Sequence, residues 1–559
     1  MVKRIIKSLE KEDGSIHGAA LLLAVSSLAS GFLGLLRDRL LAGKFGAGET
    51  LDIYYASFRL PDLLYTISIS LVSVTVLIPL FLKKKRYSGA GAKKLLDEIF
   101  TVFSIGLIVS ALILYFLIPF LNLYLTPGFD AEKQKTLSVL SRILLLSPFF
   151  LGLSNLVSSV TQANKRFMVY ALSPLVYNLS IIFGVVSLSP IFGVKGVVLG
   201  VITGSVLHLA VQLPTSRTLG FLPQTSLKIY WKDIKEIIWF SFPRSLGLTI
   251  NQVVLSIMTA LASVLSIGGI AIFNLANNLQ SVAVGVIGVS FSVAAFPVLS
   301  GLDLEKEKDV FISHFRKAAR NIVFYALPVT ALFIVLRAQI VRVIFGYENF
   351  SWTDTRLTSA ALALFSLSIL AQMLVLFFSR VFYSAHKTLK PVLVNIFSAI
   401  LTVALALWLS LAFANSVVFV NIFEKILRVE NVFGTQALIL PLAFSIGMII
   451  NALLLYYEIK KFFRLNKNFI KETITQSFFA SLLMAFVTYG SLNVLDKFFD
   501  IDTSFGIFFQ GFLSAFVGLA VWGTLLHRLK NEELMELIRS LKQKFWKTSV
   551  VIPEPQELP

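Results

Sequence analysis

Apolar residues occur along this chain in long continuous runs, without the alternation of a β-strand or the single stripe of a surface helix. Each run covers about 20 to 30 residues, which suffices to cross a hydrocarbon core of roughly 30 Å at 1.5 Å per residue. The pattern therefore predicts about fourteen membrane-spanning helices, over residues 16–41, 50–82, 97–125, 137–163, 168–190, 194–213, 236–264, 267–300, 318–345, 356–383, 391–414, 434–457, 474–495 and 504–527.

Helices are expected because only helices and closed barrels satisfy their backbone polar groups inside lipid. The runs are too long and too continuously apolar for the short alternating segments of a barrel. Composition agrees, since 56% of the 559 residues are hydrophobic and only 14% are charged. A soluble protein could not cover that much apolar surface. The expected fold class is an all-α polytopic membrane protein.

The formal net charge of +19 would suit a nucleic-acid partner, so its distribution has to decide. When the connections between runs are sorted alternately, about 34 of the 50 Lys and Arg fall on one side and about 8 on the other. This asymmetry is the positive-inside rule, and it predicts that both termini are cytoplasmic. We expect attraction to anionic lipid headgroups as a secondary consequence, and no nucleic-acid partner.

Enzyme signatures are missing from the sequence. We find no paired histidines with a carboxylate at metal-ligand spacing, no phosphate-binding P-loop and no nucleophilic serine elbow. The chain has no cysteine, so neither disulfides nor a thiolate metal site is expected. We therefore expect a protein that is not an enzyme, with no metal and no cofactor.

Two parts of the chain share a layout at a separation of about 220 residues. Segment 58–62 has a counterpart at 276–280, and segment 162–178 recurs loosely at 384–395. Six spans per repeat would leave both halves in the same orientation, as in transporters built from parallel repeats. The predicted domains are an N-terminal six-helix lobe (1–215), a C-terminal six-helix lobe (216–462), two additional helices 13 and 14 (463–528) and a cytoplasmic amphipathic tail (529–559).

Some segments are predicted not to cross the membrane. Residues 415–433 mix polar and apolar positions and suggest a short interfacial helix on the outer side. Residues 531–547 have the spacing of an amphipathic helix, which would lie on the inner membrane surface or pack against cytoplasmic loops. Residues 551–559 are predicted to be disordered.

Charged residues within the apolar runs are the candidate functional residues. A charge at the centre of a span costs at least about 2.5–3.5 kcal/mol, so it usually faces protein or water. Pro61 and Pro243 each remove a backbone hydrogen bond and can kink or break a helix beside these charges. The charged candidates are Arg37, Asp38, Arg39, Asp52, Arg59, Asp62 and Arg244.

Two interpretations of these charges are open. In the first, the arginines at 37, 39, 59 and 244 converge on an anionic group such as a phosphate, and the acidic residues hold them in place. In the second, Arg37 and Arg39 have reached the outer interface and snorkel there. Arg39 fits the first interpretation less well than Arg37, because close neighbours on a helix point in different directions.

The same region resembles a known family. Segments 34–38 (Gly-Leu-Leu-Arg-Asp), 45–48 (Phe-Gly-Ala-Gly) and 58–64 (Phe-Arg-Leu-Pro-Asp-Leu-Leu), with Asp52 between them, closely resemble the MviN/MurJ family, the lipid II flippases of bacterial cell-wall synthesis. Looser similarity continues at 162–178, 212–214, 242–247 and 382–385. The resemblance covers essentially the whole chain.

The resemblance implies a member of the multidrug/oligosaccharidyl-lipid/polysaccharide exporter superfamily. Such a protein has two six-helix lobes around a central cavity, with helices 13 and 14 forming a groove for the lipid tail. Its cargo would be lipid II, an undecaprenyl-pyrophosphate-linked disaccharide-peptide, moved from the inner to the outer leaflet of the bacterial cytoplasmic membrane by alternating access. The implied partners are membrane lipids and cell-wall synthesis enzymes, and a monomer is expected. A coupling ion or the membrane potential could drive the cycle.

The candidate residues take their expected roles from this resemblance. Family residues that match Arg37, Asp38, Asp52 and Arg59 are important for function. We expect substrate binding by Arg37, Arg59, Arg244 and Asn278. We expect a switching or orienting role for Asp38, Asp52, Pro61 and Asp62.

The chain also departs from the family pattern. Gly31, Tyr65, Thr66 and Asn278 stand where the family usually has basic residues, and 70–73 (Ser-Leu-Val-Ser) replaces a segment of small and polar residues. Either the remaining arginines suffice or the cargo differs. The alternatives are an exporter of another polyprenyl-linked glycan, a cation-coupled drug exporter and a non-transporting membrane scaffold. A membrane-embedded transferase would need a catalytic base or metal site, which we do not find.

Overall fold

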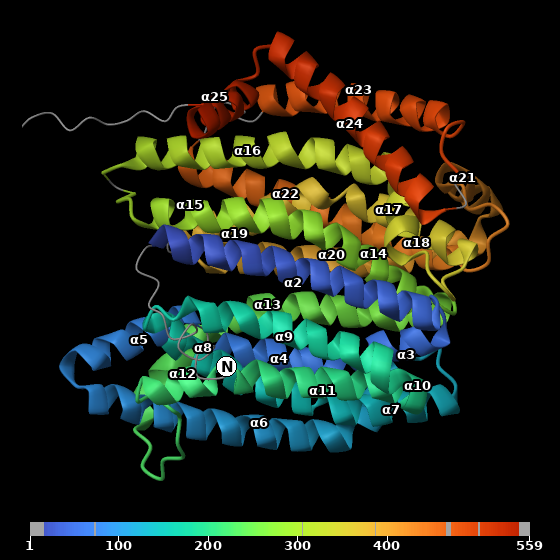
Figure 1. Ribbon diagram of the computed structural model, residues 1–559. Helices are drawn as coiled ribbons and strands as arrows, with labels where there is room; N and C mark the ends of the chain where they lie inside the picture. Colours follow the sequence, from blue (N-terminus) through green and yellow to red (C-terminus); the bar gives the residue numbers. More distant parts are fainter. Residues whose placement is uncertain are drawn as a thin grey trace, which may run out of the picture.

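The computed structural model is a bundle of long helices that run roughly side by side (Figure 1). We call the end at which α25 lies the tail end, and the opposite end the α21 end (Figure 1). No strand occurs among the residues that the structure describes, which are 16–71, 74–304, 306–385, 387–464, 471–500 and 503–546.

The first group of helices, which we call the first bundle, precedes residue 219. Its members are α2 (Ile16–Phe45), α3 (Glu49–Ser57), α4 (Arg59–Leu71), α5 (Val74–Tyr87), α6 (Gly89–Leu125), α7 (Ala131–Leu144), α8 (Leu146–Ala163), α9 (Phe167–Phe183), the π-helix η1 (Gly184–Leu188), α10 (Ser189–Phe192), α11 (Val194–Ala210) and α12 (Leu213–Thr218).

The second bundle follows, and three further helices end the described chain. The second bundle comprises α13 (Trp231–Leu265), α14 (Gly269–Ala283), the π-helix η2 (Val284–Val289), α15 (Ser290–Ser300), α16 (Lys308–Val335), α17 (Arg337–Phe345), α18 (Trp352–Ser366), α19 (Ile369–Ser384), α20 (Leu389–Asn415), α21 (Val417–Leu427), η3 (Thr435–Leu438) and α22 (Ile439–Phe463). The last three are α23 (Lys471–Leu495), α24 (Ser504–Arg528) and α25 (Glu532–Trp546).

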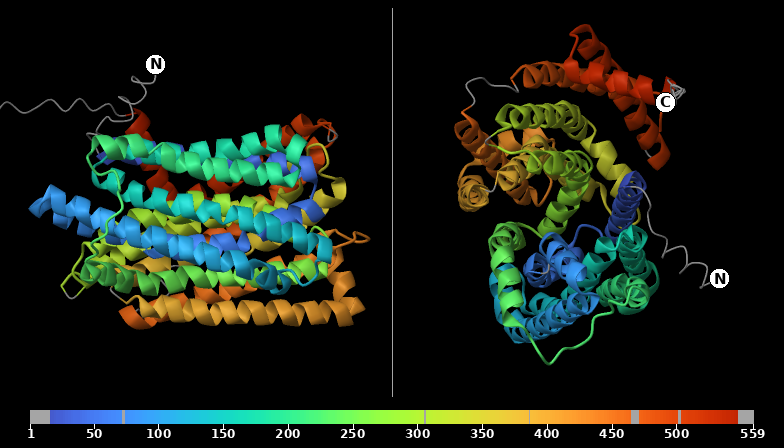
Figure 2. Two further views of the ribbon diagram at one scale, coloured as in Figure 1. Left: turned by 90° about the horizontal axis from the view of Figure 1, so that it is seen from below. Right: turned by 90° about the vertical axis from the view of Figure 1, so that its left-hand side faces the viewer.

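The two bundles lie next to each other, with α2 along their boundary (Figure 1). Seen from the tail end, the blue-to-green helices form one group and the yellow-to-orange helices another, while the red α23 and α24 lie outside the second (Figure 2). Helix α13 packs on α4 as well as on α20, so it joins the bundles along its length. The domain boundaries predicted at 215, 462 and 528 stay a prediction.

All of the predicted apolar runs coincide with helices. In the described part of the chain, ten helical segments are long and apolar enough to cross a membrane, or eleven if α18 and α19, which meet at 44°, count as one span. The remaining runs correspond to α2, to α3–α5 and to α13, which carry the charged candidate residues. The predicted fold class, an all-α polytopic membrane protein, is confirmed.

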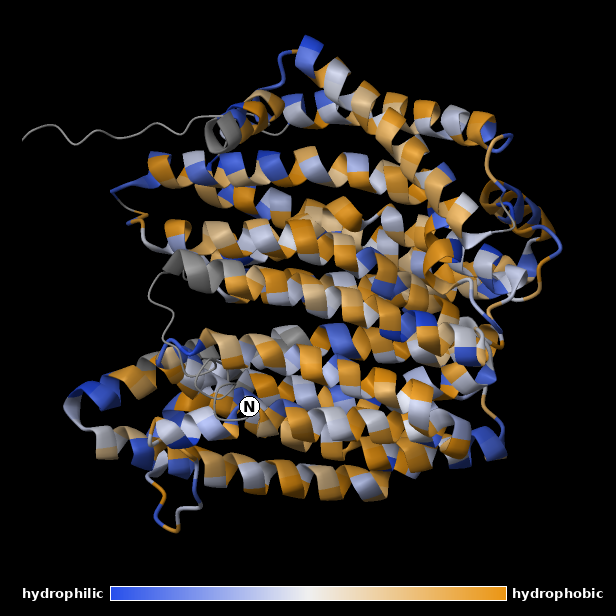
Figure 3. Ribbon diagram, viewed as in Figure 1, coloured by the Kyte–Doolittle hydropathy of each residue, from blue (hydrophilic) through white to orange (hydrophobic). Residues whose placement is uncertain are grey.

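Hydrophobic residues predominate along the middle of the helices, and hydrophilic residues are more frequent towards their ends (Figure 3). On α6, for example, Leu112, Phe116 and Phe120 are 57%, 63% and 66% exposed. Large apolar side chains at helical spacing would be costly in contact with water, whereas lipid accommodates them. The exposed surface thus has the chemistry of a membrane protein.

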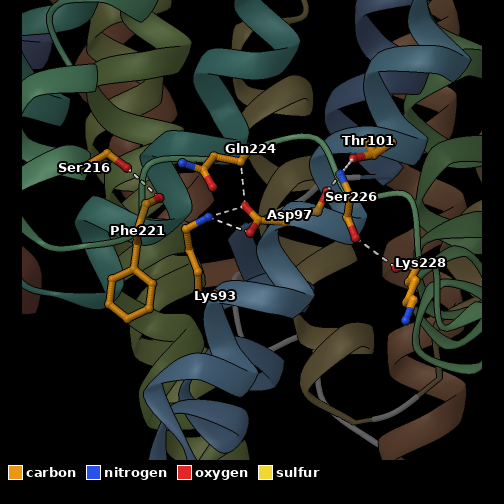
Figure 4. Close-up of polar contacts among 8 residues, drawn as sticks. All are labelled: Lys93, Asp97, Thr101, Ser216, Phe221, Gln224, Ser226 and Lys228. Carbon is orange, nitrogen blue, oxygen red and sulfur yellow. Dashed lines mark hydrogen bonds and ion pairs between the residues drawn. The ribbon is translucent and has the colours of Figure 1, made fainter.

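The segment between the bundles is fixed to the start of α6 (Figure 4). The Asp97 carboxylate accepts hydrogen bonds from the Gln224 backbone N–H at 2.8 Å and from Lys93 at 2.5 Å. Thr101 Oγ1 accepts from the Ser226 backbone N–H, also at 2.8 Å. These contacts bind the linker to the first bundle, so a change in angle between the bundles has to occur beyond it.

Both segments predicted not to cross the membrane contain helices. Helix α21 lies within 415–433. Helix α25 places Leu534, which is 7% exposed, in an apolar cluster with Phe324 and Trp522, while Leu541 is 46% exposed. Among the described residues, the first half of α25 therefore packs against helices α16 and α24, and not against the cytoplasmic loops that one of the two interpretations named. Residues 551–559 lie outside the described residues.

Candidate functional site

Arg37 and Asp38 form an ion pair within α2. Arg37 Nε donates to Asp38 Oδ1 at 2.9 Å, and Arg37 Nη2 lies 2.8 Å from the same oxygen. The third nitrogen, Nη1, donates to Asn178 Oδ1 of α9 at 3.3 Å. Asn178 also donates to Ser30 at 3.2 Å. The Arg37 side chain remains 24% exposed, so part of the guanidinium is accessible while the carboxylate holds it in place.

Asp38 also contacts the second bundle. The carboxylate is almost fully buried, and its second oxygen, Oδ2, accepts a hydrogen bond from Asn278 Nδ2 at 3.0 Å. Asn278 belongs to α14, whereas Asn178, at the other end of the chain of contacts, belongs to α9. A single ion pair on α2 thus contacts both bundles. Any group that competes with Asp38 for Arg37 leaves the Asp38 carboxylate less well neutralised.

Arg59 makes a second contact between the bundles. Its Nε donates to Thr259 Oγ1 of α13 at 2.8 Å, and its Nη2 donates to Asn274 Oδ1 of α14 at 2.7 Å. The residue is 7% exposed. It is the first residue of α4, after a break at Phe58. Pro61 lies in the first turn of α4, where its missing N–H costs no helical hydrogen bond.

Asp52 of α3 caps a helix of the other bundle. Its two oxygens accept from the backbone N–H groups of Gly268 and Ala271, each at 2.7 Å. These N–H groups belong to the start of α14, which has no helical partners for them and has a positive end. Gly268 has φ +77°, and a Cβ there would lie 2.0 Å from the carbonyl oxygen of Ala47, so the bundles touch through backbone at this point.

Two tyrosines complete the buried cluster. Tyr54 lies within electrostatic reach of Arg37, Asp38 and Asp62, and Tyr177 of α9 lies within reach of Arg37 and Asp62. Asp62 is therefore in the same cluster as the ion pair on α2. The arrangement is an almost dry, hydrogen-bonded seam between the bundles, in which carboxylates and arginines from α2, α3 and α4 contact α9, α13 and α14.

Arg39 points elsewhere. Its guanidinium donates to the backbone carbonyls of Val343 and Ile344, the latter at 3.1 Å, at the end of α17. Beside it, the Asn349 backbone N–H donates to the Gly43 carbonyl at 2.9 Å. Arg39 thus joins the bundles at the α21 end but stays apart from the Arg37 cluster, as the difference in helical direction suggested. The contacts of the seam and of Arg39 lie toward the α21 end, and a further ion pair of 2.5 Å joins Lys84 of α5 to Asp233 at the start of α13.

Arg244 lies in α13, which continues through position 243 without a break. The side chains of Pro243 and Arg244 lie outside the described residues, as do residues 72–73 of the segment that departs from the family. The substrate-binding role expected for Arg244 stays a prediction.

At two of the positions where the family usually has basic residues, a hydroxyl accepts from a neutral amide, and at a third a glycine leaves open space. The Tyr65 hydroxyl accepts from Asn155 at 3.2 Å, and Thr66 accepts from Gln252 at 3.3 Å. A Cβ at Gly31 would meet nothing within 4 Å, so a longer side chain has room there. The seam therefore holds fewer positive charges than the family pattern would place in it.

The sequence analysis assigned no role to three polar partners of these charges, Asn178, Thr259 and Asn274, whereas Asn278, for which it expected substrate binding, donates to Asp38 here. Asn178 lies within one of the repeated segments, which is a signal that could have marked it. Thr259 and Asn274 carry no such signal, because a single threonine or asparagine in an apolar run is common. Within the described part of the chain, no group of three His, Cys, Asp or Glu residues could hold a metal ion.

The fold and the seam define a class, a multi-pass membrane transporter built from two helical bundles. The solved inward-facing structure of a multidrug resistance MATE family transporter of the MOP superfamily shares this fold, with a TM-score of 0.60 at 15% identity over 79% of this chain and 98% of the other. Within this class, the family model described as lipid II flippase MurJ matches residues 41–510, and this chain belongs to that family.

Individual relatives support the assignment to this family, and a solved structure shares the fold. The chain is 28% identical over 391 residues to the probable lipid II flippase MurJ of Buchnera aphidicola subsp. Acyrthosiphon pisum, covering 68% of this chain and 75% of the relative. It is 25% identical to the lipid II flippase MurJ of Burkholderia cenocepacia, covering 68% and 76%. A solved lipid II flippase MurJ in an inward closed conformation has the same fold, with a TM-score of 0.73 at 22% identity over 91% of this chain and 100% of the other.

Proposed function

We propose that this protein is a flippase that moves lipid II from the inner to the outer leaflet of the bacterial cytoplasmic membrane. The observation that carries the proposal is the match of the lipid II flippase family model to residues 41–510, which include helices of both bundles and the seam residues from Asp52 onward, but not Arg37 and Asp38. A flippase is a transporter, so the absence of enzyme signatures in the sequence agrees with it. The positive-inside rule would place both termini and the tail end in the cytoplasm.

The seam suggests how cargo and conformation are coupled. With the tail end cytoplasmic, the seam would lie toward the outer side. A pyrophosphate that reaches the exposed part of Arg37 would compete with Asp38 for the guanidinium, because phosphate and carboxylate use the same donors. Asp38 would then lose its ion pair with Arg37, and this loss would alter the strength of the hydrogen bond that Asp38 accepts from Asn278. Cargo binding thus acts directly on a contact between the bundles.

Arg59 would act later in the cycle. It is buried by Thr259 and Asn274 in this state, so it becomes available for a phosphate only when α4 separates from α13 and α14. Asp52 would hold the outer side closed until that separation, since its carboxylate neutralises the start of α14. Alternating access requires that the loaded and empty protein prefer different states, and these exchanges of partner supply such a difference. We further propose that the protein acts as a monomer among membrane lipids, with cell-wall synthesis enzymes as partners.

The test is outward movement of lipid II in bacterial cells depleted of their own flippase. Cells express either the wild-type chain or Arg37→Ala/Arg59→Ala, at matched levels in the membrane. Arg142→Ala serves as the control, because Arg142 stacks on Tyr115 with its guanidinium carbon 4.6 Å from the ring centroid and takes no part in the seam.

We expect the wild type and the control to restore externally accessible lipid II, and the double variant to restore less than about a tenth as much, since each loses charge-assisted bonds. If the well-expressed wild type restores nothing, lipid II is not the cargo. If the double variant works as well as the wild type, the two arginines do not bind it.

A further inference from the structure

A second basic cluster lies at the α21 end, on the opposite side of the second bundle from the seam. Arg428 directly follows α21, and its Nη2 donates to the hydroxyl of Tyr489 on α23 at 3.0 Å, with the guanidinium carbon 5.7 Å from the ring centroid. Arg337, the first residue of α17, lies within electrostatic reach of both Arg428 and Tyr489. Two guanidinium groups from different segments therefore gather beside one tyrosine of α23.

Within the described part of the chain, no ion pair neutralises these two arginines. The ion pairs found among the described residues include neither Arg337 nor Arg428. By contrast, Lys133, at the same end of the first bundle, lies 2.6 Å from Glu49. Two positive charges that repel each other without an acidic partner are costly, and the sequence otherwise keeps Lys and Arg away from this side.

Three acidic residues at the α21 end form other contacts. Asp354 completes the capping box of α18, Glu424 accepts from Thr435 at 2.6 Å, and Asp496 accepts from Gln510 at 3.2 Å. Their oxygens thus satisfy local donors in the same region. Glu430, two residues after Arg428, is exposed and takes part in none of the ion pairs found among the described residues, so the two arginines stay available to another anion.

The two arginines also retain unused donors. A guanidinium offers five N–H groups, yet Arg337 has a hydrogen bond from Nη1 to its neighbour Ile334 at 3.0 Å. Arg428 adopts φ 61°, a left-handed conformation that is unfavourable for a long side chain at a helix end. Arg356 supports this conformation, because its Nη2 donates to the Arg428 carbonyl at 2.8 Å.

The surface beside the cluster is apolar. Phe486, one turn before Tyr489 on α23, is 68% exposed, and Val494 is 59% exposed. Charged groups next to apolar side chains that face lipid fit a ligand with an anionic head and a hydrocarbon tail. Guanidinium groups bind phosphate oxygens through paired N–H donors, so phosphate is the matching head.

We propose that Arg337 and Arg428 bind the phosphate headgroup of an anionic lipid between the second bundle and α23. Arg356 is a positioning residue, since it holds the backbone of Arg428. The site lies at the α21 end, so its assignment to the outer leaflet rests on the proposed function, whereas the binding itself does not. A lipid held there would lie where cargo arrives after translocation.

The experiment is native mass spectrometry of the purified full-length protein with defined lipids. The probes are phosphatidylglycerol, phosphatidylcholine and a polyprenyl monophosphate, with inorganic phosphate as a headgroup without a tail. We compare the wild type with Arg337→Gln/Arg428→Gln. The matched control is Arg142→Gln, which removes an arginine that also stacks on a tyrosine but has no second arginine beside it.

We expect the double variant to lose about tenfold in affinity for the tightest anionic lipid, and the control to stay within about twofold, because charge-assisted bonds to the phosphate are lost only in the former. A preference for phosphatidylglycerol or for the polyprenyl phosphate would support the site and identify its lipid. Equal binding of phosphatidylcholine, equal binding of inorganic phosphate, or unchanged affinity in a folded double variant would each overturn the proposal.

A photoactivatable phosphatidylglycerol and its polyprenyl counterpart test the wild-type chain without any substitution. We expect crosslinks on the α23 peptide around Tyr489, and crosslinks confined to other helices with both probes would contradict the site. Neither experiment measures translocation. A failure to flip lipid II would therefore leave the site standing, and a failure to bind lipid here would leave the flippase proposal standing.

Discussion

The polar contacts between helices at one end of the molecule differ from those at the other end in their exposure to water. At the α21 end, Asp38, Asp52 and Arg59 connect the bundles, and they are 1%, 2% and 7% exposed. At the tail end, α25 is joined to α16 by ion pairs such as Lys317 with Glu536, whose side chains are 59% and 56% exposed. The residue types are alike, but water reaches one set and hardly reaches the other.

This difference decides what each contact can do. Removing one partner of a buried charged contact typically costs about 3–5 kcal/mol, because the remaining charge stays unpaired, whereas an exposed ion pair contributes about 0–1 kcal/mol. The seam can therefore set the equilibrium between two states of the bundles with only a few residues. The tail-end pairs can orient α25 but cannot hold the bundles in one state. The comparison predicts a steep gradient of mutational effects from one end to the other.

The largest effect is expected for Asp52→Ala, which removes both hydrogen bonds to the start of α14. Each charge-assisted bond contributes about 1.5–3 kcal/mol, so the closed state at the α21 end should lose at least about 2 kcal/mol. The chain has no cysteine, which makes a single introduced thiol a clean reporter. With Ala56→Cys, a position that is 0% exposed on α3, maleimide labelling in membranes should rise at least about tenfold.

The control for this change is Asp130→Ala. Asp130 also caps a helix with its carboxylate, accepting from the Lys133 backbone N–H at 2.9 Å, but both residues belong to the first bundle. Its loss should leave the labelling of the reporter unchanged. If Asp130→Ala and Asp52→Ala raise labelling equally, general loosening of the fold explains the result and the seam has no special role.

A smaller effect is expected for Asn278→Asp. The change replaces the N–H that reaches Asp38 by a second carboxylate, so one hydrogen bond is lost and two like charges face each other, with Arg37 compensating in part. We expect the closed state to lose about 1–2 kcal/mol, seen as a severalfold rise in labelling of the same reporter. Asn278→Arg should lower labelling instead, because it gives Asp38 a positive partner.

Asn277→Asp is the matched control. Asn277 accepts from Gln280 of the same helix at 3.0 Å, and an aspartate can accept the same bond. A rise in labelling with Asn277→Asp equal to that with Asn278→Asp would show that any negative charge on α14 opens the seam, contrary to a specific contact with Asp38.

Much of the fold could be predicted because lipid imposes simple requirements. A run such as 97–125 has to be helical, since its backbone has no other way to satisfy its polar groups, and α6 covers it. The association of Arg37 with Asp38 was also within reach, because neighbouring residues need no tertiary information. Family segments around these residues then indicated which of the charged positions matter.

The partners across the seam could not be predicted in this way. Asp52 accepts from backbone N–H groups more than 200 residues away, and backbone groups leave no mark in a sequence. The partners of Arg39 were equally hidden, because they are backbone carbonyls at the end of a short helix, α17. The hydropathy pattern and the composition predict single helices from their contact with lipid or water, whereas the contacts of the seam depend on how the two bundles pack against each other.

The smallest effect is expected at the tail end, for Lys317→Gln. Its ion pair with Glu536 spans 2.5 Å but lies in water, so we expect a change in stability below about 0.5 kcal/mol and no change in reporter labelling. Arg320→Gln at the same end should cost more, because Arg320 contacts Glu533, whose side chain is 5% exposed, at 2.5 Å. Thermal unfolding of the purified variants at low and high salt measures both, and salt should weaken only the Lys317 contact appreciably. If Lys317→Gln opened the α21 end as far as Asp52→Ala does, burial would not be what separates the two ends, and α25 would have to be counted among the elements that set the state of the bundles.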